Sequence, residues 1–437
     1  MRFRGLLIVA AGLATAGTAP AATLVGFAAL PADTFVPGPT SGQFGVGGNG
    51  SNGPFVGRQP VQGFSAILSN GRGGYQVMAD NGFGTKANSA DALLYVHDVD
   101  VDFRTAAGGS GTVTVNGSST LSDPNRKLGF TTVADQATYY GGTIPVDPAI
   151  RDGRLLTGAD LDIESFRRVA DGSYYFGDEF GPYLVHTDAQ FRVIDKAIPL
   201  PGVQSVDNPL LAGGKANLAS SGGFEGMALS TDGKTLYTLL EKTVTGDAAG
   251  TLRINAFDVA SQRFTDQQFT YALTEGGTAI GDMTAIGDGR FVVIERDGGQ
   301  GAAAKFKRIY GIDLNQVDAN GRLVKTELLD LMNIADPDDL NGDGSTSFSF
   351  PFVTIEDVLP VDEQTLLIVN DNNYPGSAGR TPGRSDNNEF IKVRLDRPFA
   401  AAVPEPSSWA LMIAGFGVVG GALRRRGVAR FLRSPAV

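Results

Sequence analysis

The chain has 437 residues, a formal net charge of −11, 42% hydrophobic residues, 59 glycines, two histidines and no cysteine. The acidic balance argues against nucleic acid or an anionic membrane surface as the main partner. Without cysteine there is no disulfide, cysteine nucleophile or thiolate metal site, and two histidines are too few for a typical zinc hydrolase. Any chemistry would therefore depend on carboxylates, amides and a hard cation.

Residues 1–22 have the layout of a secretory signal peptide. Two arginines precede an apolar run, and the small residues Ala19 and Ala21 mark an A-x-A-like cleavage site. A buried N-terminal helix is the alternative, although it would not explain the basic start. We expect cleavage near Ala21 or Ala22, so that the mature chain works outside the cytoplasm.

Residues 23–400 are expected to form one domain, in which a unit of two short apolar strands recurs. Each unit has a polar residue before its first strand and an acid after its second, and the two lie 13 to 16 residues apart. The five pairs are Ser65 and Asp80, Glu164 and Glu179, Glu225 and Glu241, Asp282 and Glu295, and Glu356 and Asp371. This separation fits two strands of about five residues joined by a short turn. Three of the units carry Asp-Gly between the strands, which is a strong hairpin signal.

Recurrence of this unit predicts an all-β fold of the β-propeller type. Alternating runs that follow the hairpins are expected to form outer strands of the blades. Successive units start 57 to 99 residues apart, which predicts loop insertions, and the longest gap could hold another blade near residues 130–142. We expect about six blades, within a range of five to seven. A two-sheet sandwich is the rival architecture, but sandwiches seldom repeat one unit so often.

The acids of the repeated unit are expected to meet at one end of the propeller. An antiparallel hairpin returns to the end where it began, so its first and last residues share one rim. Crowded carboxylates repel one another unless cations bind or their pKa values rise, and calcium is the natural occupant of such an oxygen-rich site. The expected metal ligands are Glu164, Glu179, Glu225, Asp282, Glu295, Glu356 and Asp371, with Asp80, Asp178 and Glu241 close by. Turn capping or solubility would explain any one of these acids alone.

A second acidic stretch has the first half of a calcium-binding loop. Asp339, Asn341 and Asp343 are followed by Gly344, in the order of a D-x-[DN]-x-[DN]-G motif. Phe350 stands where the bidentate glutamate of such a loop should be. A surface calcium loop and a plain acidic loop therefore both remain open.

The C-terminal tail, residues 401–437, reads as a sorting signal. A Pro-Glu-Pro motif at residues 404–406 precedes an apolar run at 409–423 and three arginines at 424–426. This order resembles the PEP-CTERM sorting signal. The resemblance implies cleavage by an exosortase-type membrane enzyme, in a Gram-negative bacterium that makes exopolysaccharide. A plain tail anchor, with the apolar run as a transmembrane helix, is the alternative.

Three blocks resemble the bacterial family named for the esterase-like activity of phytase. They are GFEGMALSTDGKTLYTLLE, FSFPFVTIEDVLPVDEQTLLIVNDNNYP and DNNEFIKVRLD, and the similarity extends over about residues 22–398. The resemblance implies a β-propeller that hydrolyses ester or phosphoester bonds. The residues of this chain that lie at the family's motif positions are Glu225, Glu356, Asn370, Asp371 and Asn372.

The leading hypothesis is a secreted, surface-sorted hydrolase in which calcium neutralises a phosphate ester and activates a bound water. Glu225 and Glu356 are the candidates for ligand or general base, and Arg296 could stabilise developing charge. Substrate contacts are expected from Asn370, Asn372 and Arg380.

Two alternatives belong to other classes. One is a non-catalytic propeller that binds exopolysaccharide or a partner protein. The other is hydrolysis of carboxylic esters without a metal, but the chain has no G-x-S-x-G motif and no serine with an evident base. His97 and His186 both lie in strand-like runs.

Overall fold

The computed structural model describes residues 22–211, 213–287 and 289–399. The expected signal peptide, apart from Ala22, and the whole expected sorting tail lie outside these ranges. Within them, no helix has the length and apolar character needed to cross a membrane. The apolar run 409–423, on which the transmembrane alternative rests, is not among the described residues.

The described chain is a β-propeller built from five antiparallel blades of four strands each. The first blade contains β6 (Phe64–Ser69), β7 (Tyr75–Ala79), β8 (Tyr95–Asp102) and β9 (Thr112–Thr120). The second contains β10 (Ile163–Arg168), β11 (Tyr174–Asp178), β12 (Tyr183–Thr187) and β13 (Ile198–Pro199). The third contains β14 (Phe224–Leu229), β15 (Thr235–Leu240), β16 (Thr251–Asp258) and β17 (Arg263–Ala272). The fourth contains β18 (Ala279–Gly287), β19 (Arg290–Arg296), β20 (Lys307–Val317) and β21 (Leu323–Asp330). The fifth contains β24 (Asp357–Pro360), β25 (Thr365–Val369), β26 (Asn388–Leu395) and β1 (Ala22–Leu30).

The first strand of each hairpin lies on the inside of a closed ring. β6 contacts β10, β10 contacts β14, β14 contacts β18, β18 contacts β24, and β24 contacts β6 again. Five blades lie within the expected range and are one fewer than the six we expected. Residues 130–142 do not supply the additional blade. They contain the 3-10 turns η1 (Val133–Asp135) and η2 (Tyr139–Gly141), which lead to the short helix α1 (Pro148–Gly153).

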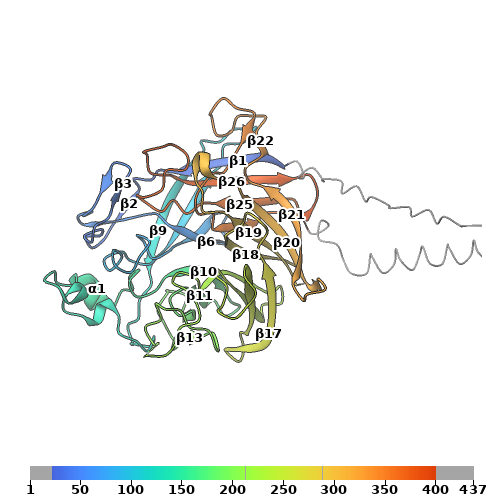
Figure 1. The fold of residues 1–437 in the computed structure, drawn as a ribbon. Helices are drawn as coiled ribbons and strands as arrows, with labels where there is room; N and C mark the ends of the chain where they lie inside the picture. Colours follow the sequence, from blue (N-terminus) through green and yellow to red (C-terminus); the bar gives the residue numbers. More distant parts are fainter. Residues whose placement is uncertain (1–21, 212, 288, 400–437) are drawn as a thin grey trace, which may run out of the picture.

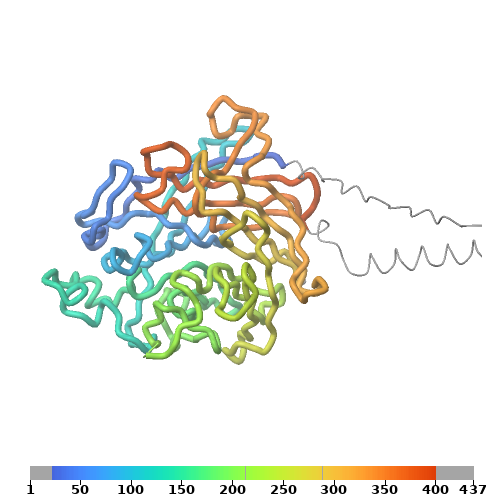
Figure 2. Tube along the Cα trace, in the orientation of Figure 1, coloured from blue at the N-terminus to red at the C-terminus, as the bar shows by residue number. Residues whose placement is uncertain are grey.

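The two ends of the propeller domain close the ring. β1, from the N-terminal side, pairs antiparallel with β26 from Ala22↔Leu395 to Leu30↔Asn388, and the two strands lie side by side in Figure 1. The blue start of the chain therefore lies against its red end in Figure 2. A parallel pair between Ala29 and Thr112 also joins β1 to the first blade. Opening the ring would therefore require β1 to separate from strands with which it pairs.

Apolar packing between adjacent blades fixes the ring. Five hydrophobic clusters each combine residues of two neighbouring blades, as Met78 and Phe166 do between the first and second. Ile294 and Ile368 meet in the same way between the fourth and fifth. Close-packed interfaces of this kind resist small displacements, so the inner strands hold their ends at fixed positions around the axis.

Short elements decorate this ring. β2 (Phe35–Pro37) pairs with β5 (Arg58–Pro60), and β3 (Gly47–Gly48) pairs with β4 (Ser51–Asn52). β22 (Ile334–Ala335) pairs with β23 (Ser347–Phe348) and with β1. The loop insertions expected from the uneven spacing are therefore present.

We predict that Leu24→Ala will destabilise the whole propeller. The side chain of Leu24 is 1% exposed and packs in the cluster between the fourth and fifth blades. Its truncation should lower the free energy of unfolding by about 2–5 kcal/mol, measured by urea denaturation. Val25→Ala, at the half-buried next position of the same strand, is the control and should cost about 1 kcal/mol or less. Equal effects at the two positions would contradict a closing role for β1.

Candidate functional site

In three of the five inner strands, a polar residue near the start lies at an irregular point of the strand. The pairing register shifts across Ser65 in β6, across Glu164 in β10 and across Glu225 in β14. Such β-bulges leave one residue unpaired and re-aim its side chain, and they are common beside active sites. In the fifth blade, Glu356 directly precedes β24. We call Ser65, Glu164, Glu225 and Glu356 the bulge positions.

The fourth blade departs from this pattern. Its register shift spans two residues, Gly281 and Asp282, between Ile280 and Met283. A Cβ atom on Gly281 would lie 1.9 Å from the backbone oxygen of Ile355, so the strand has no room there for a side chain. The fourth blade therefore contributes no carboxylate at its bulge position.

A second set of residues follows the second strand of each hairpin. Backbone amides of Asp80, Glu179 and Glu241 bond the residues that precede β6, β10 and β14. Arg296, the last residue of β19, pairs with Ala279 at the equivalent place in the fourth blade. Asp371 takes this place in the fifth blade, where its backbone oxygen accepts a hydrogen bond from Thr354. We call Asp80, Glu179, Glu241, Arg296 and Asp371 the rim positions.

One arginine lies among acids of neighbouring blades. Nη2 of Arg296 is 3.3 Å from Oε1 of Glu225, 3.4 Å from Oε1 of Glu241 and 3.1 Å from Oε1 of Glu356. Oε2 of Glu356 accepts a hydrogen bond of 3.0 Å from the hydroxyl of Ser65. Side chains of four blades are therefore linked within hydrogen-bond distance.

A second group of acids comes from the second blade alone. Asp162, Glu164 and Glu179 each place one carboxylate oxygen within 4.8 Å of the others. Their side chains are buried, and neither Oε2 of Glu164 nor Oε1 of Glu179 has a hydrogen-bond partner in the described part of the chain. We call the bulge positions, the rim positions and Asp162 together the mouth.

Burial and mutual repulsion raise the pKa values of seven acids in the mouth. Burial is the main cause for Asp162, whose pKa rises to about 6, and for Glu356, whose pKa rises to about 8. Burial followed by the charge of Asp80 raises the pKa of Asp371 to about 8. The pKa values of Glu164, Glu179, Glu225 and Asp80 are raised well above their usual range, again by burial first and by neighbouring carboxylates second.

A cavity of about 280 Å³ opens next to this group of acids. It is lined by Asp80, by glycine-rich segments at residues 45–47 and 82–84, by Asn88 and by residues 373–377. Asp80 is thus the mouth carboxylate that borders a cavity large enough for a small polar molecule.

Residues 59–374 match the family model described as phytase-like, esterase-like activity of phytase. This match covers more than half of the 437 residues. The chain belongs to this family. The result confirms the resemblance carried by the GFEG, TIED and NDNN blocks. Residues 402–426 match the PEP-CTERM protein-sorting motif, which indicates secretion, surface sorting in bacteria and processing by an exosortase-type enzyme.

Solved structures with similar folds include proteins of unrelated kinds. A luciferin-regenerating enzyme is 13% identical and matches over 76% of this chain and 77% of its own, with a TM-score of 0.34. A GH43 β-1,3-galactosidase with galactodeoxynojirimycin is 11% identical over 81% and 94%, with a TM-score of 0.37. The propeller of Dos1 is 10% identical over 79% and 69%, with a TM-score of 0.30. None of the curated proteins matches the chain significantly. These likenesses carry no argument about activity.

Two acids that we expected among the metal ligands of this phytase-like propeller lie elsewhere. Asp282 pairs with Arg167 at 3.3 Å and accepts a hydrogen bond of 3.2 Å from the amide of Val358. Glu295 accepts hydrogen bonds from Tyr271 and from the amide of Thr274, and pairs with Lys325. Both carboxylates are thus occupied by protein partners outside the mouth. Asp178, expected close by, accepts hydrogen bonds from the amide of Asp162 across the hairpin and from the amide of Gly181 in the following turn.

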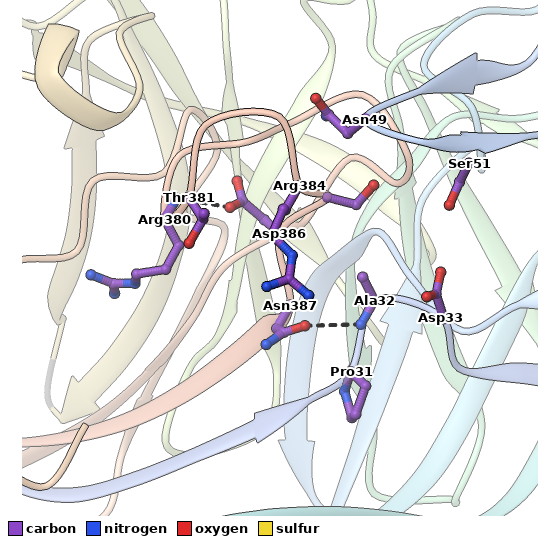
Figure 3. A pocket seen from close by; sticks show the side chains of 11 residues that line it. Pro31, Ala32, Asp33, Asn49, Ser51, Arg380, Thr381, Arg384, Asp386 and Asn387 are labelled. Atoms are coloured by element: carbon purple, nitrogen blue, oxygen red, sulfur yellow. Dashed lines mark hydrogen bonds between the residues drawn. The ribbon is translucent and has the colours of Figure 1, made fainter. Parts of the chain in front are cut away.

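The three residues expected to contact substrate also have other partners. Asn370 and Asn372 are fully buried and bond the backbone of residues 386–389 and Gly63. Arg380 forms two hydrogen bonds to Glu389, of 2.9 and 2.6 Å, and lines a different cavity of about 380 Å³. In Figure 3 its guanidinium points away from the other lining residues. All three side chains therefore already have protein partners in the described structure.

The partial calcium loop acts as a self-capped turn. Oδ1 of Asp339 accepts a hydrogen bond of 3.0 Å from the amide of Gly344, and Asp343 bonds Asn341 and the amide of Ser345. These contacts satisfy the acids locally, as in ordinary Asp-rich turns.

One arrangement was missed in the sequence. His186 lies 2.9 Å from the hydroxyl of Ser173 through Nε2 and 2.6 Å from Asp195 through Nδ1. The statement that no serine has an evident base was therefore wrong. However, the same hydroxyl also donates to Asp171 at 2.7 Å, and Ser173 lies at the β10–β11 turn, at the end of the hairpin opposite Glu164 and Glu179. No sequence motif could have found this trio, because its members meet only across β11, β12 and a following loop.

We predict that the metal-free protein loses stability as the pH rises from about 5 to about 8. Asp162, Glu356 and Asp371 have raised pKa values in the folded chain, so their contribution is complete below their unfolded pKa near 4 and is lost as the pH passes the folded values of about 6 to 8. Surface acids with lowered pKa values titrate below this window. Melting temperature in the presence of a chelator should fall accordingly.

Asp371→Asn is the matched variant for this prediction. It preserves shape but removes one group with a pKa of about 8, so the pH dependence of the unfolding free energy should become weaker by about 1 kcal/mol per pH unit. A melting temperature that is constant or rises over the window would contradict the raised pKa values.

Proposed function

We propose that this phytase-like protein hydrolyses phosphate esters at the mouth, with the help of a bound divalent cation, for which calcium is the best fit. The observation that carries the proposal is the meeting of bulge and rim residues of four blades around Arg296, together with the three clustered acids of the second blade. Family membership supports an esterase-like activity, and the phosphate ester and the cation are our additions.

The residues of the mouth fit a hard cation. Calcium binds carboxylate and carbonyl oxygens, and the mouth offers buried carboxylates, two of which, Glu164 and Glu179, have an oxygen without a hydrogen-bond partner. Carboxylates on the side away from Arg296 would hold the ion. When bound, such an ion neutralises phosphate charge and lowers the pKa of a coordinated water.

Arg296 is suited to contact the phosphate. Its Nη2 pairs with three glutamates, whereas its Nε is buried and has no hydrogen-bond partner within the described residues. A phosphate oxygen would satisfy this donor in a site where water is scarce. Electrostatic stabilisation by one fixed donor of this kind typically changes a rate by 10²–10³-fold.

Two carboxyl groups could move the protons of the reaction. Water attacks phosphorus, the bond between phosphorus and the leaving oxygen breaks, and the products are an alcohol and inorganic phosphate. Glu356, held by Ser65 and Arg296, would accept the proton of the attacking water. Asp80 has a pKa raised by burial, then by Asp162, and borders the cavity, so it would donate a proton to the leaving oxygen.

Location follows from the two ends of the chain. The sorting motif indicates secretion and surface sorting. We propose that residues 1–22 act as the export signal and that the host is a Gram-negative, exopolysaccharide-producing bacterium. In that setting a non-catalytic role in binding exopolysaccharide or a partner protein is the alternative that the activity test must exclude.

The test is phosphatase activity of the purified chain starting at residue 23. We expect turnover of p-nitrophenyl phosphate with calcium and loss of activity with a chelator. Arg296→Lys and Glu356→Gln should each lower kcat/KM by about 10²-fold or more. Ser173→Ala, outside the mouth, is the control and should leave this activity unchanged.

Three other outcomes would contradict the proposal. Absence of turnover on any phosphate ester, with or without metal, would favour the binding role. Activity that survives the chelator would exclude the cation. Cleavage of carboxylic esters that disappears in Ser173→Ala would favour the metal-free esterase, whose one supporting observation is the contact between Ser173 and His186.

A further inference from the structure

We propose that the mouth binds a single divalent cation, in a site formed by the carboxylates of Asp162, Glu164 and Glu179. This inference deepens the proposed function and rests on it for the role of the ion. Binding itself can be measured without a substrate.

The spacing of the three carboxylates suits calcium. One oxygen of each residue lies within 4.8 Å of the others. Calcium–oxygen distances are about 2.3–2.6 Å, so two ligand oxygens on one ion lie at most about 4.6–5.2 Å apart. The three carboxylates are therefore close enough to share one ion. Magnesium demands near-octahedral geometry and gives up its bound waters reluctantly, so a set of three carboxylates favours calcium.

Unsatisfied oxygen atoms indicate that a ligand belongs there. The side chains of Glu164 and Glu179 are only 7% and 3% exposed, yet Oε2 of the first and Oε1 of the second have no hydrogen-bond partner among the described residues. Buried polar atoms are almost always paired with protein, water or an ion. A bound cation would satisfy both oxygens at once.

Asp162 distinguishes the second blade from the other four. It directly precedes the inner strand β10, at a place occupied by Gly63, Gly223, Ala279 and Thr354 in the other blades. Its Oδ1 accepts a hydrogen bond of 2.8 Å from the amide group of Asn81, which fixes the orientation of the carboxylate. The second blade is thus the one in which the bulge position, the rim position and the preceding residue are all acids.

The lysine side chains near the site contact other groups and, among the described residues, form no ion pair with these three carboxylates. Nζ of Lys86 donates to the backbone oxygen of Asp207 at 2.7 Å and lies 4.0 Å from the ring centroid of Phe180. Lys242 pairs with Glu241 at 3.4 Å. In the described ranges no ion pair links a lysine or arginine to Asp162, Glu164 or Glu179.

Arg296 excludes a second ion from the other side of the mouth. It lies within 3.4 Å of Glu225, Glu241 and Glu356, where its positive charge takes the place that a divalent cation would otherwise fill. Like charges at such short range repel strongly in a buried site. The two halves of the mouth therefore differ, with a built-in cation in one and room for a bound ion in the other.

Calcium titration of the chelator-treated chain from residue 23, followed by calorimetry, tests the site. We expect one bound calcium per chain, with magnesium binding at least tenfold more weakly. Asp162→Asn and Glu179→Gln should each weaken calcium binding at least tenfold. Asp343→Asn, in the acidic loop at residues 339–344, is the matched control and should bind calcium as the unmodified chain does. Circular dichroism checks the fold of each variant.

Removal of the positive charge at Arg296 tests the exclusion of a second ion. Arg296→Met keeps an unbranched side chain and leaves three glutamates without their shared cation, so we expect two bound calcium ions per chain. If it still binds one, exclusion by Arg296 is wrong. The site is wrong if the unmodified chain binds no calcium. It is also wrong if Asp343→Asn abolishes binding while Asp162→Asn and Glu179→Gln both retain it. A chain that binds calcium at this site but hydrolyses no phosphate ester would keep the site and refute the proposed function alone.

Discussion

The closed ring of inner strands forces acidic side chains of different blades into one buried volume, and the rest of the site depends on how their charge is compensated. Carboxylates in a poorly solvated place either take up protons or attract cations. Arg296 supplies one positive charge to Glu225, Glu241 and Glu356. The pKa of Glu356 nevertheless rises to about 8, because burial and Asp371 oppose ionisation more than Arg296 favours it. One arginine therefore does not compensate the carboxylate charge of the whole mouth.

Much of this arrangement follows from hairpin length. An acid 15 or 16 residues after a bulge residue must return to the same rim, so Glu164 with Glu179, Glu225 with Glu241, and Glu356 with Asp371 could be placed from the sequence. The pair Asp282 and Glu295 is separated by only 13 residues, and both residues were placed wrongly. Had the 15-residue spacing been required there, it would have matched Gly281 with Arg296, which is the arrangement of the fourth blade. The two-residue bulge in β18 changes which residues of the hairpin lie opposite each other. A bulge leaves no clear sign in a single sequence.

Other features depend on contacts that no local pattern records. Asp162 lies outside the repeated positions and becomes part of the mouth because β10 begins directly after it. Asn370 and Asn372 have the residue type of ligands, but their amide groups hold the backbone of a later loop. Ser173, His186 and Asp195 meet because β12 pairs with β11 and the following chain folds back. Five blades close the ring where six were expected, since the insertion after β9 forms turns and a short helix.

Surface sorting would expose the proposed site to the ions of the surrounding medium. Calcium sites of extracellular modules bind with Kd values of about 0.1–1 mM, which is weaker than the sites of intracellular sensors. Carboxylates must lose their protons before they bind a metal, so calcium binding would weaken as the pH falls. Compensation by an external ion would then make the charge of the mouth depend on the surrounding medium.

The most direct measurement is the crystal structure of the chain soaked with manganese, a calcium substitute with anomalous scattering, together with a phosphate analogue such as vanadate. We predict one anomalous peak among Asp162, Glu164 and Glu179, with the analogue between that ion and Nε of Arg296. A peak among Glu225, Glu241 and Glu356, a peak only at the acidic loop around Asp343, or an empty mouth with an ordered analogue elsewhere would contradict it.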